Sequence, residues 1–174
     1  MEPVTRTVNG LEIAACGAYE GPLREAIHHA KYGDEPALME ELGLLLAEVI
    51  AGDLARGTRL DAIVPVPLHP GRRRERGYDQ VLLLAAVAAR HTGAPVVPAL
   101  HRIRGGVAQV RLDRHGRAAN VRSAFVGTAG ALRGGMVALI DDVATTGATL
   151  GDAAAAARAC GARAVRAYVV ALDE

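Results

Sequence analysis

Residues 137–150, VALIDDVATTGATL, constrain the fold of this chain more than any other stretch. Four apolar residues end in two adjacent aspartates, a run of Val, Ala, Thr and Gly follows, and then an Ala-rich segment with a helical pattern. This order predicts a buried strand at 137–141, a short loop and a helix at 149–160. Strands that pass directly into helices build parallel sheets, in which ligands bind at the carboxyl ends of the strands. We therefore expect the two aspartates to lie at a ligand site.

The rest of the chain alternates between strand and helix patterns. Asn9-Gly10 predicts a tight hairpin turn between strands at 4–8 and 11–15. Helical spacing of apolar residues, with Pro and Gly at the ends, predicts helices at 21–33, 36–54 and 79–91. Short apolar runs predict further strands at 61–67, 94–99 and 164–172. Because these strands are apolar throughout, we expect a doubly wound, mostly parallel α/β sheet covered on both faces.

Composition narrows the class of protein. The 174 residues suit one domain, and 51% hydrophobic but only 3% aromatic residues predict a core of Val, Leu, Ile and Ala. A net charge of +1 does not indicate nucleic acid as a partner, and no apolar run is long enough to span a membrane. The polar N-terminal segment does not resemble a signal peptide, so we expect a cytoplasmic protein. The two cysteines, Cys16 and Cys160, are expected to be reduced and buried rather than metal ligands.

The loop Thr145–Thr149, TTGAT, has the properties of a phosphate-binding loop. Small residues let backbone N–H groups approach an anion, the threonines add hydroxyl donors, and the following helix adds its unpaired N–H groups. Neither GxxxxGK[ST] nor GxGxxG is present, which disfavours P-loop NTPases and dinucleotide-binding enzymes.

Asp141 and Asp142 stand just before this loop, where a carboxylate would repel a phosphate. Aspartates before a helix often do no more than cap it and compensate its dipole. Carboxylates are also good acceptors for the vicinal hydroxyls of a ribose. A ribose 5-phosphate carries both groups, so one ligand accounts for the whole stretch.

ALIDDVATTGAT resembles the motif with which type I phosphoribosyltransferases bind 5-phosphoribosyl 1-pyrophosphate (PRPP). Three further blocks are similar to the ComF family of competence-associated phosphoribosyltransferase-like proteins: AIHHAKYG at 26–33, VPVPLHPGRRRERGYDQ at 64–80 and HRIRGGVAQVRLDRHGRAANVRSAF at 101–125. The resemblance covers the chain from about residue 16 onward. It implies the type I phosphoribosyltransferase fold as a single domain, with a small hood at 1–35 and a core at 36–174.

The resemblance also implies roles for individual residues. Asp141 and Asp142 would hold the ribose hydroxyls and act in catalysis. The 5′-phosphate would lie against the following residues: Val143, Thr145, Thr146, Gly147, Ala148 and Thr149. Pyrophosphate would be bound by Arg72, Arg74, Arg76 and Gly77, because guanidinium groups bind phosphate oxygens in a bidentate way. A mobile loop at about 101–122, with six arginines and one aspartate, would close over it through Arg102, Arg104, Gln109, Arg117 and Asn120. Lys31 and Tyr32 match the family pattern too, as ligand contacts or as packing residues.

The implied reaction is displacement of pyrophosphate from C1 of the ribose, with Mg²⁺ carried mainly by the substrate. Purine-salvage relatives often have an acid where this chain has Thr145, so no general base is assigned and a 6-oxopurine acceptor is disfavoured. The acceptor stays unidentified. Family members are linked to natural competence, so the alternative is a PRPP-binding protein that contacts single-stranded DNA with little catalysis. Other ribose-phosphate ligands remain open as well.

Two further expectations come from the family. A homodimer is expected by resemblance. Many members begin with a four-cysteine zinc ribbon, and two cysteines cannot form one, so functions that depend on the ribbon are not expected of this sequence.

Overall fold

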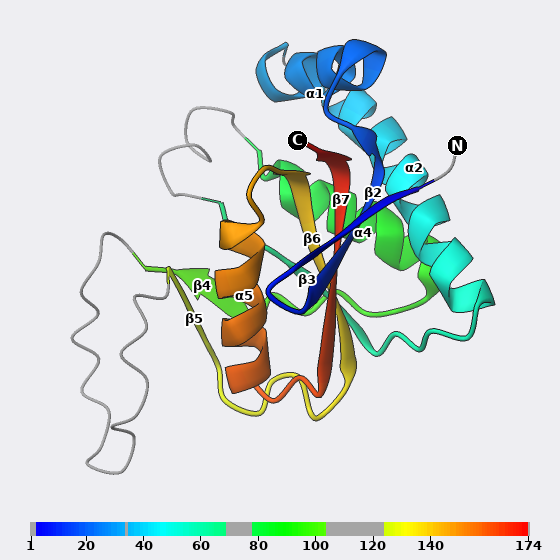
Figure 1. Ribbon diagram of the computed structural model, residues 1–174. Coiled ribbons are helices and arrows are strands. Elements are labelled where there is room, and N and C mark those ends of the chain that lie inside the picture. The colour runs from blue at the N-terminus through cyan, green and yellow to red at the C-terminus, as the bar shows by residue number, and fades with distance from the viewer. Residues whose placement is uncertain (1–2, 34, 69–77, 104–123, 174) are drawn as a thin grey trace.

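Strands and helices alternate along the chain as the sequence predicts (Figure 1). The computed structural model describes residues 3–33, 35–68, 78–103 and 124–173. The strands are β1 (Val4–Val8), β2 (Leu11–Ala18), β3 (Ala62–Pro65), β4 (Leu100–Arg102), β5 (Phe125–Gly127), β6 (Met136–Ala144) and β7 (Ala164–Leu172). The helices are α1 (Gly21–Tyr32), α2 (Pro36–Ala55), α4 (Gln80–Thr92) and α5 (Ala148–Ala159). All four predicted helices are confirmed to within about one residue at each end. The predicted hairpin is confirmed too, but its second strand continues to Ala18, three residues beyond the expected end at 15, because it pairs with β7.

Five strands form the central sheet in the order β1-β2-β7-β6-β3. β2, β7, β6 and β3 run parallel to one another. β1 pairs with β2 in the antiparallel direction, because the chain reverses at the Asn9-Gly10 turn. Both turn residues have positive φ, 49° and 77°, as the hairpin prediction requires. A mostly parallel α/β sheet is therefore confirmed.

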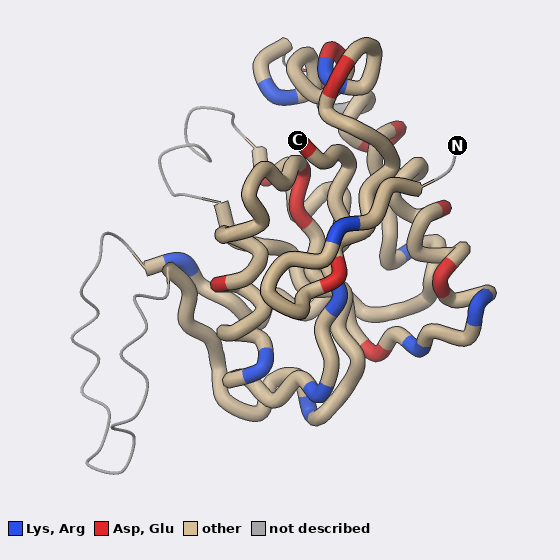
Figure 2. Tube along the Cα trace, viewed as in Figure 1, with Lys and Arg blue, Asp and Glu red and all other residues tan. Residues whose placement is uncertain are grey.

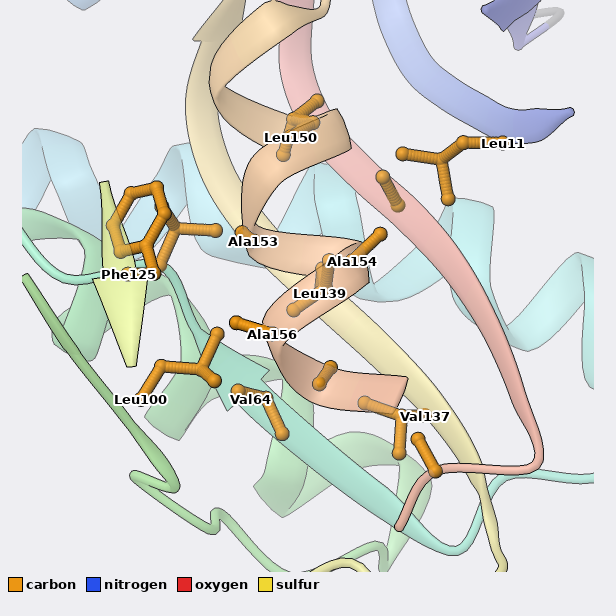
Figure 3. Packing of buried hydrophobic residues seen from close by; sticks show 14 of the residues in the cluster. Leu11, Val64, Leu100, Phe125, Val137, Leu139, Leu150, Ala153, Ala154 and Ala156 are labelled. Carbon is orange, nitrogen blue, oxygen red and sulfur yellow. The ribbon is translucent and has the colours of Figure 1, made fainter. Parts of the chain in front are cut away.

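Helices cover both faces of this sheet (Figure 1). From Val137 to Ile140, successive residues of β6 alternate between the two faces: Val137 and Leu139 belong to the core under α5, whereas Ala138 and Ile140 belong to the core under α2 and α4. Figure 3 shows the α5 side, where Leu150, Ala153, Ala154 and Ala156 lie over Leu139 of β6 and Val64 of β3. The alanines let the helix approach the sheet closely. Cys16 and Cys160 are free and buried, as expected.

Two other predicted strands differ from the structure in their length. Residues 94–99 form only a single bridge, between Val96 and Ile63, because Pro95 and Pro98 have no N–H to donate to a ladder. β6 was expected to end at Asp141 but continues to Ala144, because Val143 and Ala144 pair with β7. The two aspartates therefore lie within the strand and not after it.

The N-terminal hairpin is part of the central sheet, since β2 pairs in parallel with β7. Only α1, of the residues expected in a hood, lies beyond the carboxyl ends of the strands, at the top of Figure 1. The division into a hood at 1–35 and a core at 36–174 stays a prediction. β4 and β5 were not expected; they form a separate two-stranded ribbon at the ends of the 104–123 segment, which lies outside the described residues.

In the described part of the chain, no helix combines the length and the apolar character that crossing a membrane requires.

Candidate functional site

A cavity of about 480 Å³ opens at the carboxyl ends of β3 and β6. Its walls come from four elements: the residues after β3, the end of β6 with its loop, the first turn of α5, and one arginine of β4. The lining residues are Val66, Pro67, Leu68, Arg102, Asp141, Asp142, Val143, Ala144, Thr145, Thr146, Gly147, Ala148, Thr149 and Leu150. Ligands of parallel α/β proteins bind in this place.

The loop between β6 and α5 has a fixed shape. Gly147 precedes α5 with a φ of 76°, and a Cβ there would meet Ile13 Cδ1 at 3.1 Å and Val8 Cγ2 at 3.2 Å. Only glycine suits both the backbone angle and the close approach of the hairpin. Thr146 Oγ1 accepts a hydrogen bond from the Ala148 N–H at 3.3 Å. The loop therefore turns tightly and presents the N-terminus of α5 to the cavity.

The first turn of α5 has free capacity for an anion. Gly147 supplies no side-chain cap, and the turn contains no acidic residue. Thr145, Thr146, Ala148 and Thr149 are exposed to solvent. Unpaired N–H groups and hydroxyls at a helix N-terminus form a favourable site for a terminal phosphate.

Asp141 and Asp142 point in opposite directions because they are consecutive residues of one strand. Alternation after Ile140 places Asp141 on the α5 face, and Asp141 lines the cavity together with the loop Thr145–Thr149. Asp142 lies on the other face, where its Oδ2 is 2.8 Å from Lys31 Nζ of α1 and accepts a hydrogen bond from Gln80 Nε2 of α4. Backbone N–H groups also bond to the pair: Asp142 N donates to Asp141 Oδ1 at 2.8 Å, and Val143 N donates to Asp142 Oδ1 at 2.6 Å.

The Asp141 carboxyl is electrostatically unusual. Burial, followed by repulsion from the neighbouring Asp142, raises its pKa to about 8. The backbone hydrogen bond and the positive charges of Lys31 and Arg102 only partly oppose this rise. In the protein without ligand, Asp141 therefore holds a proton near neutral pH, and a hydroxyl or a cation at this site would alter its protonation.

Comparison with known proteins identifies the family. No family model matches the chain. The chain is 32% identical over 153 residues to the DNA utilization protein YhgH of Escherichia coli K12, a match of 86% of this chain and 67% of that protein. The chain belongs to the ComF family of phosphoribosyltransferase-like proteins. It is also 32% identical over 142 residues to competence protein F of Haemophilus influenzae, covering 78% of this chain and 62% of that one.

The length of the ComF relatives differs from that of this chain. The YhgH protein of Salmonella typhimurium is 32% identical over 139 residues, which make up 78% of this chain and 61% of that relative. The chain thus spans about three fifths of the length of this curated relative.

Solved structures establish the fold. Adenine phosphoribosyltransferase of Trypanosoma brucei, in complex with AMP, pyrophosphate and ribose-5-phosphate, matches 100% of this chain and 87% of its own, at 14% identity and a TM-score of 0.53. Glutamine PRPP amidotransferase of B. subtilis, in complex with ADP and GMP, matches 75% of this chain and 25% of its own, at 23% identity and a TM-score of 0.52. The chain has the type I phosphoribosyltransferase fold.

The structure brings together the predicted ribose and phosphate residues of this ComF protein. The cavity is lined by Asp141, Asp142, Val143, Thr145, Thr146, Gly147, Ala148 and Thr149, and Arg102 joins them from β4. The other expected contacts lie outside the described residues: Arg72, Arg74, Arg76, Gly77, Arg104, Gln109, Arg117 and Asn120. The ligand roles of all of these residues stay predictions.

Sequence reasoning missed two partners of Asp142. Lys31 and Gln80 both match the family pattern, but they are 111 and 62 residues away from Asp142 in sequence, so no local pattern indicates the contacts. Asp79, which stands where the family usually has Asn, accepts a hydrogen bond from Leu82 N at 3.1 Å and caps α4. An aspartate at position 79 is therefore compatible with the helix α4, which begins at Gln80.

Proposed function

We propose that this protein binds PRPP in the cavity and transfers its phosphoribosyl group to an acceptor. One observation carries the proposal: a single cavity joins a carboxyl, Asp141, to the exposed loop Thr145–Thr149 at an uncapped helix N-terminus. The carboxyl suits ribose hydroxyls and the loop suits the 5′-phosphate. A ribose 5-phosphate unit carries both groups at a fixed separation.

The reaction is a displacement at C1 of the ribose. A bond forms between C1 and the acceptor while the C1–O bond to pyrophosphate breaks, and pyrophosphate leaves with the bonding electrons. Positive charge develops on the sugar, as in other glycosyl transfers. Arg102 lines the cavity and supplies positive charge for the leaving group. Thr145 supplies no base, so the acceptor must lose its proton to another group or bind already deprotonated.

Magnesium fits this site as a companion of the substrate. No cluster of three or more His, Cys, Asp or Glu residues suited to a metal occurs among the described residues. Mg²⁺ keeps few protein ligands and prefers phosphate oxygens, and Asp141 is the carboxyl that faces the cavity from the α5 side. When bound, the cation would neutralise charge on the pyrophosphate.

Pyrophosphate release tests the transferase proposal. Wild-type protein with PRPP and Mg²⁺ is offered a panel of nucleobases and amines, and at least one acceptor is expected to release pyrophosphate. The Asp141→Ala variant should lose this release. The Asp152→Asn variant, which removes a carboxylate of α5 outside the cavity lining, should retain it. No release with any acceptor by a protein that binds PRPP would overturn the catalytic part of the proposal.

The second candidate is a PRPP-binding protein that contacts single-stranded DNA with little catalysis. The names of the relatives, a competence protein and DNA utilization proteins, support it. In the described part of the chain, Lys and Arg positions are interspersed with Asp and Glu positions along the trace (Figure 2). A protein that neutralises several phosphates should lose affinity for DNA steeply as salt rises. Negligible binding at low salt would remove this candidate.

A further inference from the structure

Lys31 and Asp142 form an ion pair between α1 and the central strand β6. The Lys31 Nζ lies 2.8 Å from Asp142 Oδ2, and the two side chains are only 14% and 12% exposed. Tyr78, which precedes α4, donates its hydroxyl to the carbonyl of Ala30, the residue before Lys31. The C-terminal turn of α1 is thus attached to the cavity wall at Asp142 and to the segment before α4 at Tyr78.

Asp142 has little hydrogen-bonding capacity left for a ligand. Its Oδ2 already accepts from Lys31 and Gln80, and its Oδ1 accepts from the Val143 N–H. Within the described part of the chain, by contrast, the Asp141 carboxyl accepts a single hydrogen bond, from the Asp142 N–H to Oδ1. The strand geometry places the Asp141 side chain on the side of the phosphate loop.

Electrostatic repulsion explains why it is useful for one of the two aspartates to be paired with a lysine. The Asp142 carboxylate and a phosphate in one cavity repel each other, and the low dielectric of a partly buried site strengthens the repulsion. The ion pair with Lys31 compensates the negative charge of Asp142. The cavity then presents a single carboxyl to the sugar and keeps a favourable potential for the phosphate.

We propose that Lys31 is a positioning residue, which occupies the Asp142 carboxylate and compensates its charge, so that Asp141 alone receives the ribose hydroxyls. This inference rests on the proposed ribose-phosphate site and changes its prediction, because the sequence motif assigns both aspartates to the sugar. Asp142 forms part of the cavity wall and the anchor of α1.

The test measures the affinity of ribose 5-phosphate by calorimetry in four proteins: wild type, Lys31→Met, Asp142→Asn, and the double variant. Lys31→Met leaves Asp142 uncompensated, so its affinity should fall about tenfold. Adding Asp142→Asn to that variant removes the unwanted charge, and the affinity should return to within about threefold of wild type. Lys31→Arg should behave as wild type, because it keeps the charge and the donor.

A model in which Asp142 contacts the ribose directly predicts the opposite change in affinity. If Asp142 bound the ribose itself, Lys31→Met would free it and leave the affinity unchanged or higher, and adding Asp142→Asn would lower the affinity further. Either result overturns the inference. Arg24→Met is the matched control, since it removes another cation of α1 that lies beside Tyr19 and not in the cavity. It should leave the affinity unchanged.

A separate readout distinguishes this inference from the proposed function. If wild type does not bind ribose 5-phosphate, the proposed function fails. Thermal unfolding of the same four proteins without ligand then tests whether Lys31 and Asp142 stabilise the fold as a pair. Coupled residues give a double variant that unfolds at nearly the same temperature as the Lys31→Met single variant. If the losses in unfolding temperature of the two single variants simply added up in the double variant, the Lys31–Asp142 pair would not anchor α1.

Discussion

Arg6 in the N-terminal hairpin donates a hydrogen bond from Nη1 to the backbone carbonyl of Thr145, the first residue of the loop Thr145–Thr149, at 2.8 Å. Its Nη2 donates to the carbonyl of Asp173 at 3.0 Å. One side chain therefore joins β1 to the loop after β6 and to the end of β7. Because Thr145 belongs to the loop that lines the cavity, the hairpin takes part in shaping this loop.

Arg6→Met should loosen this loop. Loss of the two hydrogen bonds is expected to lower the free energy of unfolding by about 1–2 kcal/mol and to weaken the binding of inorganic phosphate. Arg163→Met is a suitable control, since Arg163 Nε donates to the carbonyl of Gly134 at 3.3 Å outside the cavity. It should cost stability without changing phosphate affinity. Equal phosphate affinity in both variants would show that Arg6 does not shape the loop.

Gly147→Ala should damage the loop more directly. The left-handed φ of 76° disfavours any residue with a Cβ, and a methyl group at 3.1 and 3.2 Å from Ile13 and Val8 would push these side chains aside by a few tenths of an ångström. We expect a loss of at least about 1–2 kcal/mol in unfolding free energy, together with weaker phosphate binding. Gly151→Ala in α5 is the comparison, because a Cβ there meets nothing within 4 Å. That variant should be as stable as wild type or more stable. Similar unfolding midpoints for the two variants would contradict the expected constraint at Gly147.

The raised pKa of Asp141 predicts a pH dependence of stability. The folded protein holds a proton up to about pH 8, whereas the unfolded chain releases it near pH 4. The folded state binds more protons in this range, so the free energy of unfolding should fall as pH rises from about 4 to about 8. Asp141→Asn should flatten this fall. Urea unfolding of both proteins at several pH values measures the difference, to which groups distant from Asp141 contribute nothing. Parallel profiles would refute the raised pKa.

The sequence predicted most of the fold because its signals are local. The Asn9-Gly10 turn, the helical spacing and the apolar run before Asp141 each depend on neighbouring residues, and each was confirmed. The end of β6 was missed because pairing with β7 extends the strand beyond the two aspartates. Tertiary pairing of this kind has no local signature.

The site was predictable as a place but not as a set of contacts. The motif located the cavity wall from Asp141 to Thr149. It could not show that alternation along a continuing strand separates the two carboxyls, or that Lys31 reaches one of them from α1. These facts come from the packing of α1 and α4 against the sheet.

Titration of PRPP with Mg²⁺ into the protein tests the central claim most directly. Calorimetry should detect saturable binding to wild type and to Asp152→Asn. Asp141→Ala should bind at least about tenfold more weakly, because it removes the carboxyl that accepts the ribose hydroxyls. Absence of binding to wild type, or equal affinity in Asp141→Ala, would contradict the assignment of this cavity to a ribose phosphate.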